Sequence, residues 1–127
     1  MEGLAKILYV AAGGAAGAVA RYLINISPLA ELFQKFPFPT FFINVSGAFL
    51  IGLLFIALND RFDVGDNIKL ALIVGFLGAF TTFSTFEIEL YGLIKDRNFF
   101  TAFAYLFLSI AAGFIGLLAG VWLARKM

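Results

Sequence analysis

Four long apolar stretches, separated by short polar connectors, constrain the fold of this chain more than any other feature. A helix needs about 20 mostly apolar residues to cross the hydrocarbon layer of a membrane. The stretches that meet this length are residues 4–26, 38–58, 68–94 and 101–123. The prolines lie in or directly after the first connector, and most of the charged residues lie in the connectors, where turns are expected. The sequence therefore predicts an all-α membrane protein with a single four-helix transmembrane domain over residues 1–127.

The composition excludes most enzyme classes. The chain contains no cysteine, so it has no disulfide, no reactive thiol and no thiolate metal ligand. It contains no histidine either, which removes the side chain that most often transfers protons near neutral pH. Its basic residues form no cluster of the kind that binds nucleic acid. We expect neither an enzyme nor a nucleic-acid-binding protein, and the lipid bilayer is an expected partner.

The basic residues are divided almost evenly between the two sides of the membrane. The side with both termini and the second connector carries Lys6, Arg61, Lys69, Arg125 and Lys126. The opposite side carries Arg21, Lys35, Lys95 and Arg97. An excess of Lys and Arg normally fixes the cytoplasmic side, and here that signal is nearly absent. The chain is either weakly oriented or inserts both ways, in which case two opposed copies form an antiparallel, dual-topology homodimer.

The segment GFLGAFTT in the third span predicts a broken helix. Gly75 and Gly78 precede Thr81 and Thr82 near the centre of this span. A break at this depth leaves backbone carbonyls that must be buried or must line a site. In transporters, the carbonyls of unwound helices hold cations. The alternative is that these glycines serve close helix packing, which we expect of nearly all other glycines in the spans.

Four hydroxyl and two phenyl side chains are clustered at residues 81–86, at the predicted break. At about 100° per residue, Thr81, Ser84 and Thr85 would share one face of a helix. Phe83 and Phe86 would share the opposite face. The alternative is that each hydroxyl bonds back to the carbonyl four residues earlier, as Ser and Thr often do in helices. Such back-bonding suits one or two residues better than a whole cluster.

Between residues 41 and 85, outside the second connector, the polar side chains inside the spans are neutral. Asn44 lies in the second span, and Tyr105 and Ser109 lie one turn apart in the fourth. The alternative for Asn44 is an interhelical hydrogen bond worth about 1 kcal/mol. Neutral donors suit a small anion that must lose water and then be released, because a fixed cation would hold it too tightly. The electropositive edges of phenyl rings can also face an anion.

Three blocks resemble the Fluc fluoride-channel family. They are GGAAGAVARY (13–22), FFINVSGAFLIG (41–52) and GFLGAFTTFSTFEIE (75–89). The fourth span adds a Tyr and a Ser at matching places, so the resemblance covers essentially the whole chain. It implies a passive fluoride channel that exports fluoride across the bacterial plasma (inner) membrane and lowers its toxicity. It also implies a dual-topology homodimer with two antiparallel pores.

The resemblance further implies roles for individual residues. Asn44 would be the pore amide, and Phe83 and Phe86 would be the phenyl pair that lines the pore. Tyr105 and Glu89 would belong to the pathway beyond the phenyl rings. The hydroxyls along a polar track would be Ser84, Thr85 and Ser109.

The resemblance also implies a metal site and a vestibule. The backbone carbonyls of Gly78 and Thr81, from both copies, would hold a structural Na⁺ on the dimer axis. Arg21 would lie in the aqueous vestibule that draws in anions. Phe80 departs from the family pattern, because an aliphatic residue is expected before TTFSTF.

Two other functions compete with the fluoride channel. A proton-coupled small multidrug exporter would have the same four spans and dual topology, and it would need Glu87 or Glu89 as its intramembrane carboxylate. An accessory membrane subunit would explain the glycines, but it would leave the hydroxyl and phenyl cluster unexplained. The choice of fluoride rests on the resemblance alone, since neutral donors also suit other small solutes.

Overall fold

The computed structural model describes residues 1–127 as helices joined by short connectors, without a β-strand. α1 (Glu2–Asn25) leads into a loop with a short turn, η1 (Pro28–Glu31), and α2 (Phe38–Ile56) ends in the wide turn η2 (Ala57–Arg61). The third crossing consists of α3 (Asp66–Lys69), η3 (Leu70–Leu77), α4 (Gly78–Phe80) and α5 (Phe83–Lys95). α6 (Phe99–Lys126) is the last helix.

Four helical units are long and apolar enough to cross a membrane. They are Glu2–Asn25, Phe38–Arg61, Asp66–Lys95 and Phe99–Lys126. Their ends lie within one helical turn of the spans expected from hydropathy. The protein is therefore a multi-pass, all-helical membrane protein.

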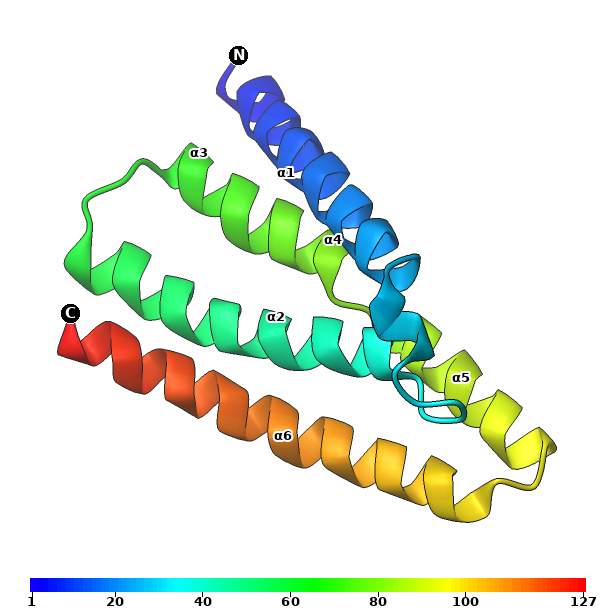
Figure 1. The fold of residues 1–127 in the computed structure, drawn as a ribbon. Coiled ribbons are helices and arrows are strands. Elements are labelled where there is room, and N and C mark those ends of the chain that lie inside the picture. Colours follow the sequence, from blue (N-terminus) through cyan, green and yellow to red (C-terminus); the bar gives the residue numbers. More distant parts are fainter.

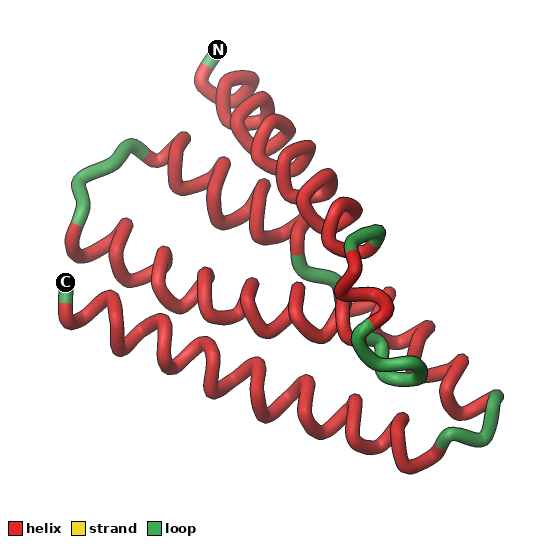
Figure 2. The backbone as a smooth tube through the Cα atoms, viewed as in Figure 1, coloured by secondary structure: helices red, strands yellow, loops and turns green.

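The four crossings pack as two pairs. α2 runs beside α6 in the same direction, and α1 runs beside the first half of the third crossing (Figure 1). The backbone tube shows a non-helical link in the middle of the third crossing, between α4 and α5 (Figure 2). This link lies beside the first half of α2, which places it between the two pairs.

Glycines bring the paired helices into close contact. A side chain at Gly17 would overlap the carbonyl of Phe76 on η3, and one at Gly120 would overlap the carbonyl of Phe49 on α2. This confirms that these glycines serve helix packing. Gly75 has the same role, because a Cβ atom there would lie 2.6 Å from the carbonyl oxygen of Val10. The interpretation that pairs Gly75 with Gly78 as a cause of the break is therefore wrong for Gly75.

The break in the third crossing is present, and threonines form it. Thr81 (φ −81°, ψ 156°) and Thr82 (φ −150°, ψ 120°) are extended, whereas Gly78 keeps helical angles. β-branched residues favour extended backbone. Thr82 also starts the next helix as its N-cap, since its Oγ1 accepts a hydrogen bond from the Thr85 N–H at 3.2 Å.

The bulky Phe80 is accommodated by burial beside the break. Its ring is buried against Ile43 and Leu77 and stacks on Phe76, with ring centroids 5.6 Å apart. Gly47 faces it across the helix contact, where a Cβ atom would lie 3.5 Å from the Phe80 ring. That distance is an ordinary contact, whereas the same Cβ atom would overlap the Thr81 methyl group, so the glycine on α2 makes room for Thr81 at the break.

Candidate functional site

A hollow of about 310 Å³ lies at the break, where α2 and α6 face the link between α4 and α5. Its lining residues are Asn44, Ala48, Thr81, Thr82, Phe83, Phe86, Ser109, Ile110 and Gly113. No charged side chain lines it. Asn44 and Ala48 are four residues apart on α2, as are Ser109 and Gly113 on α6, which places each pair on one helix face. We call this hollow the break pocket.

Asn44 is held to the break by two hydrogen bonds. Its Nδ2 donates to the carbonyl oxygen of Thr82 at 3.0 Å, and its Oδ1 accepts from the Thr82 N–H at 2.9 Å. An amide group has two N–H donors, so one remains for a ligand. Asn44 therefore joins α2 to the break, as the packing alternative proposes, and still has a donor at the pocket wall.

Ser109 presents an unpaired hydroxyl. Its Oγ is buried and forms no hydrogen bond within the chain. Buried polar atoms are nearly always hydrogen-bonded, so an unpaired one marks a place where a ligand or water is expected. The first turn of α5 begins at the same wall, because Thr82 and Phe83 both line the pocket. The N-terminus of a helix carries a partial positive charge that favours anions.

The predicted phenyl pair lies side by side at the pocket. The ring centroids of Phe83 and Phe86 are 6.0 Å apart, and the rings are tilted by 50°. Phe86 is buried, with 5% of its surface exposed, whereas Phe83 is 74% exposed. One wall of the break pocket therefore ends at the open surface of the single chain.

Tyr105, Glu89 and Thr40 form a hydrogen-bonded polar cluster beside the buried Phe86 ring. The Tyr105 hydroxyl donates to Glu89 Oε1 at 2.8 Å, and the Thr40 hydroxyl donates to Glu89 Oε2 at 3.1 Å. The Tyr105 ring contacts the Phe86 ring edge to face, with centroids 4.9 Å apart. The structure thus brings Tyr105 and Glu89 together, and their place in an ion pathway stays a prediction. It adds Thr40, which the sequence analysis missed although it lies one turn before Asn44 on the same helix face.

Ser84 and Thr85 do not line the break pocket. Ser84 is exposed, Thr85 is half-buried, and neither side chain forms a hydrogen bond within the chain. The Thr81 hydroxyl bonds back to the carbonyl of Leu77 at 2.9 Å. The prediction that Thr81 shares a helix face with Ser84 and Thr85 is wrong, because the break separates Thr81 from α5 and interrupts the helical periodicity.

Comparison with known proteins identifies the family of this chain. The family model described as "CrcB-like protein, Camphor Resistance (CrcB)" matches residues 8–121. The chain belongs to the CrcB family. A relative from Geobacter sulfurreducens is 41% identical over 98% of this chain and 100% of its own length. Others are from Phenylobacterium zucineum (45%; 95% and 96% of the two chains) and Solibacter usitatus (39%; 95% and 99%), and all three are named fluoride-specific ion channel FluC.

The break of this CrcB protein also leaves two carbonyls without helical partners. The Thr82 N–H, four residues after Gly78, donates to Asn44 instead of to the Gly78 carbonyl. Thr81 lies between two helices, and its carbonyl accepts no backbone hydrogen bond. These are the two carbonyls predicted to hold Na⁺.

Arg21 lies at the same break. Its Nε donates to the carbonyl oxygen of Ala79 at 3.1 Å, in the last turn before the helix ends. A cation is favourable at a helix C-terminus, where carbonyls lack partners. In this CrcB protein Arg21 therefore links α1 to α4, and its predicted place in a vestibule remains a prediction.

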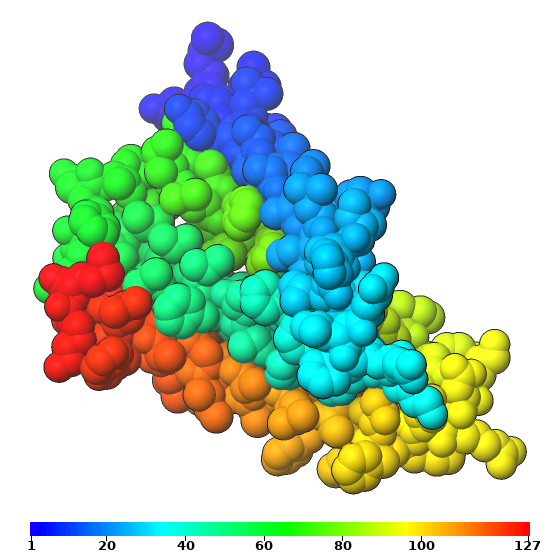
Figure 3. Space-filling model, viewed as in Figure 1, coloured from blue at the N-terminus to red at the C-terminus, as the bar shows by residue number.

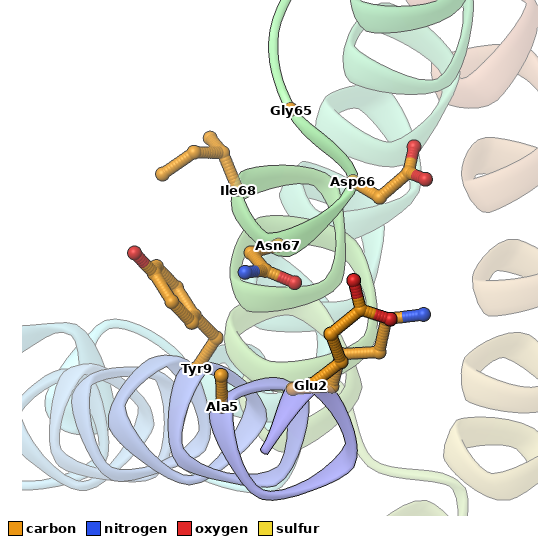
Figure 4. Close-up of a pocket in the computed structure, with 8 residues that line it drawn as sticks. Glu2, Ala5, Tyr9, Gly65, Asp66, Asn67 and Ile68 are labelled. Carbon is orange, nitrogen blue, oxygen red and sulfur yellow. The ribbon is translucent and has the colours of Figure 1, made fainter.

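A second hollow, of about 500 Å³, lies far from these residues. It opens between the start of α1 and the start of α3, and Tyr9 and Asn67 project into it from the two elements (Figure 4). Most of its lining residues are exposed, and none of the predicted site residues lies there. The break pocket is therefore the candidate site of this CrcB protein.

Proposed function

We propose that this protein is a fluoride-specific ion channel that lets fluoride leave the cytoplasm passively across the bacterial inner membrane. The observation that carries the proposal is the uncharged break pocket, with an amide, a free buried hydroxyl and a phenyl pair at the start of α5. Neutral donors and a helix N-terminus replace part of the water around an anion without holding it permanently. The names of the relatives support fluoride as that anion.

The predicted site residues have complementary roles in this proposal. The free N–H of Asn44 and the hydroxyl of Ser109 donate to the anion in the break pocket. The ring edges of Phe83 and Phe86 face it at the next step. Beyond the rings the proposed pathway passes Tyr105 and Glu89, which are hydrogen-bonded to each other. Further residues of the proposed pathway are Ser84 and Thr85 on the polar track and Arg21 in the vestibule.

The proposed channel is an antiparallel homodimer with two pores. Phe83 is largely exposed on the single chain, and the break pocket is open on that side, so a second copy would complete the wall. The even division of basic residues favours insertion in both orientations. The unpaired carbonyls of Gly78 and Thr81 from both copies would hold a structural Na⁺ at the dimer axis, as unwound helices do elsewhere.

No observation favours the proton-coupled multidrug exporter. Glu87 is exposed on α5, outside the break pocket. Both carboxylate oxygens of Glu89 accept hydroxyl hydrogen bonds next to a buried aromatic ring. An exporter of large organic cations needs a carboxylate that is accessible from a wide cavity, and neither residue meets this requirement.

Fluoride efflux from vesicles tests the channel proposal. Purified protein is reconstituted in vesicles loaded with potassium fluoride, and release is followed with a fluoride electrode after valinomycin is added. We expect rapid release without a pH gradient, and little release from matched vesicles loaded with chloride. Fluoride release at the rate of protein-free vesicles would refute a fluoride channel, and release only with a pH gradient would indicate a coupled exporter.

Single cysteines test dual topology, because the chain contains none of its own. Asp63→Cys lies in the α2–α3 connector and Asp96→Cys in the α5–α6 connector, both exposed and on opposite sides of the membrane. In intact cells, a membrane-impermeant thiol reagent should label about half of the copies of each variant. Full labelling of one variant and none of the other would show a single orientation.

A further inference from the structure

Phe36, in the α1–α2 loop, packs on Tyr105 of the proposed pathway. The ring centroids of Phe36 and Tyr105 are 5.3 Å apart, and the rings meet edge to face at 73°. Phe86 contacts Tyr105 in a similar way, at 4.9 Å and 69°. Tyr105 has no exposed surface. Its ring is thus clamped between Phe86 of the predicted phenyl pair and Phe36 from the loop.

The backbone around Phe36 is fixed by its neighbours. Pro37 adopts φ −75° and ψ 72°, and the Phe38 N–H donates to the Phe36 carbonyl at 2.8 Å, which is an inverse γ-turn. Proline restricts its own φ and the conformation of the residue before it. The Phe36 ring also meets Phe41 edge to face at 5.3 Å. The loop lies against the start of α6 in the space-filling view, light blue to cyan against yellow and orange (Figure 3).

The orientation of Tyr105 has chemical consequences for Glu89. The Tyr105 hydroxyl supplies the hydrogen bond to Oε1, and Thr40 supplies the one to Oε2. If the Tyr105 ring turned away, one carboxylate oxygen of the half-buried Glu89 would lose its donor. Leaving such an acceptor unpaired costs more than the hydrogen bond itself contributes. An edge-to-face neighbour on each side prevents that rotation.

We infer that Phe36 is a positioning residue of the ion pathway, which acts by holding Tyr105 in the orientation that bonds Glu89. This inference rests on the proposed channel function for its effect on flow, and on contacts alone for its effect on Tyr105. An aromatic ring at position 36 should therefore affect fluoride efflux only in protein that carries the Tyr105 hydroxyl. Phe33, in the same loop, contacts Phe36 but not Tyr105, and is the matched control.

The first test is a double-mutant cycle on fluoride efflux. Phe36→Leu should lower the efflux rate by about threefold or more, and Phe36→Tyr, which keeps the ring, should restore most of it. Adding Phe36→Leu to Tyr105→Phe should cause no further loss, because the hydroxyl that the ring positions is already absent. Phe33→Leu should leave efflux unchanged. Unchanged efflux in Phe36→Leu, or an independent further loss in the double variant, would overturn the inference.

The second test observes Tyr105 without measuring flow. Protein labelled with 3-fluorotyrosine has four tyrosine signals, and Tyr105→Phe identifies the one from Tyr105. That fluorine signal should be single in the wild type and broadened or split in Phe36→Leu, with Phe36→Met as a second ringless variant. A single sharp signal in both variants would overturn the positioning role. Absence of fluoride efflux in the wild type would overturn only the channel proposal, because the fluorine signal tests the clamp separately.

Discussion

Asn44→Asp is expected to reduce fluoride efflux to the rate of protein-free vesicles, a loss of at least about a hundredfold. The substitution has two effects at once. It places a negative charge in the wall of the break pocket, where the permeating ion is itself negative. It also replaces the N–H that donates to the Thr82 carbonyl with an oxygen, so that two acceptors face each other at a distance now bridged by a 3.0 Å hydrogen bond. The measurement is the fluoride-electrode assay on reconstituted vesicles.

The matched control for Asn44→Asp is Asn59→Asp. Asn59 lies in η2, and its Nδ2 donates to the carbonyl of Phe55 at 2.7 Å, so the chemical change is the same. It is exposed and outside the break pocket, and we expect Asn59→Asp to keep the efflux of the wild type. Gel filtration of each variant establishes that the protein is folded. Efflux retained in a folded Asn44→Asp protein would remove Asn44 from the pathway.

Hydropathy predicts the spans of this protein well, because each crossing must be apolar over its whole length. The break was also predictable, although its cause was assigned to the wrong residue type. Gly75 and Gly78 were expected to weaken the helix, whereas extended Thr81 and Thr82 form the break and Asn44 stabilises it. The local sequence indicates the region in which the helix is interrupted. The exact residues depend on hydrogen bonds from another helix, here those between Asn44 and Thr82.

The side-chain partners within the site were less predictable. Thr40 and Phe36 lie far from Tyr105 in the sequence, and their contacts depend on how α2 and the α1–α2 loop pack against α6. The helical periodicity that grouped Thr81 with Ser84 fails because α5 begins anew at Phe83. Residues joined by periodicity within one helix were predictable, and residues joined across helices were not.

Phe83→Ile is expected to lower fluoride efflux by about three- to tenfold. Isoleucine keeps an apolar side chain but lacks the ring edge, whose electropositive hydrogens would face the anion. Because Phe83 is 74% exposed on the single chain, its replacement changes the packing of that chain little. The measurement is again efflux from fluoride-loaded vesicles.

Phe107→Ile separates the ring-edge effect from a general effect of losing an aromatic ring. Phe107 lies on α6, is exposed to a similar degree and is outside the break pocket, so this variant should keep wild-type efflux. Equal losses in both variants would show that exposed rings act only through contacts with lipid or with the second copy. A loss confined to Phe83→Ile would mean that the aromatic edge itself takes part in conduction. In that case the anion meets partial positive charges from the Asn44 amide to the Phe83 ring edge, without a fixed cation that could trap it.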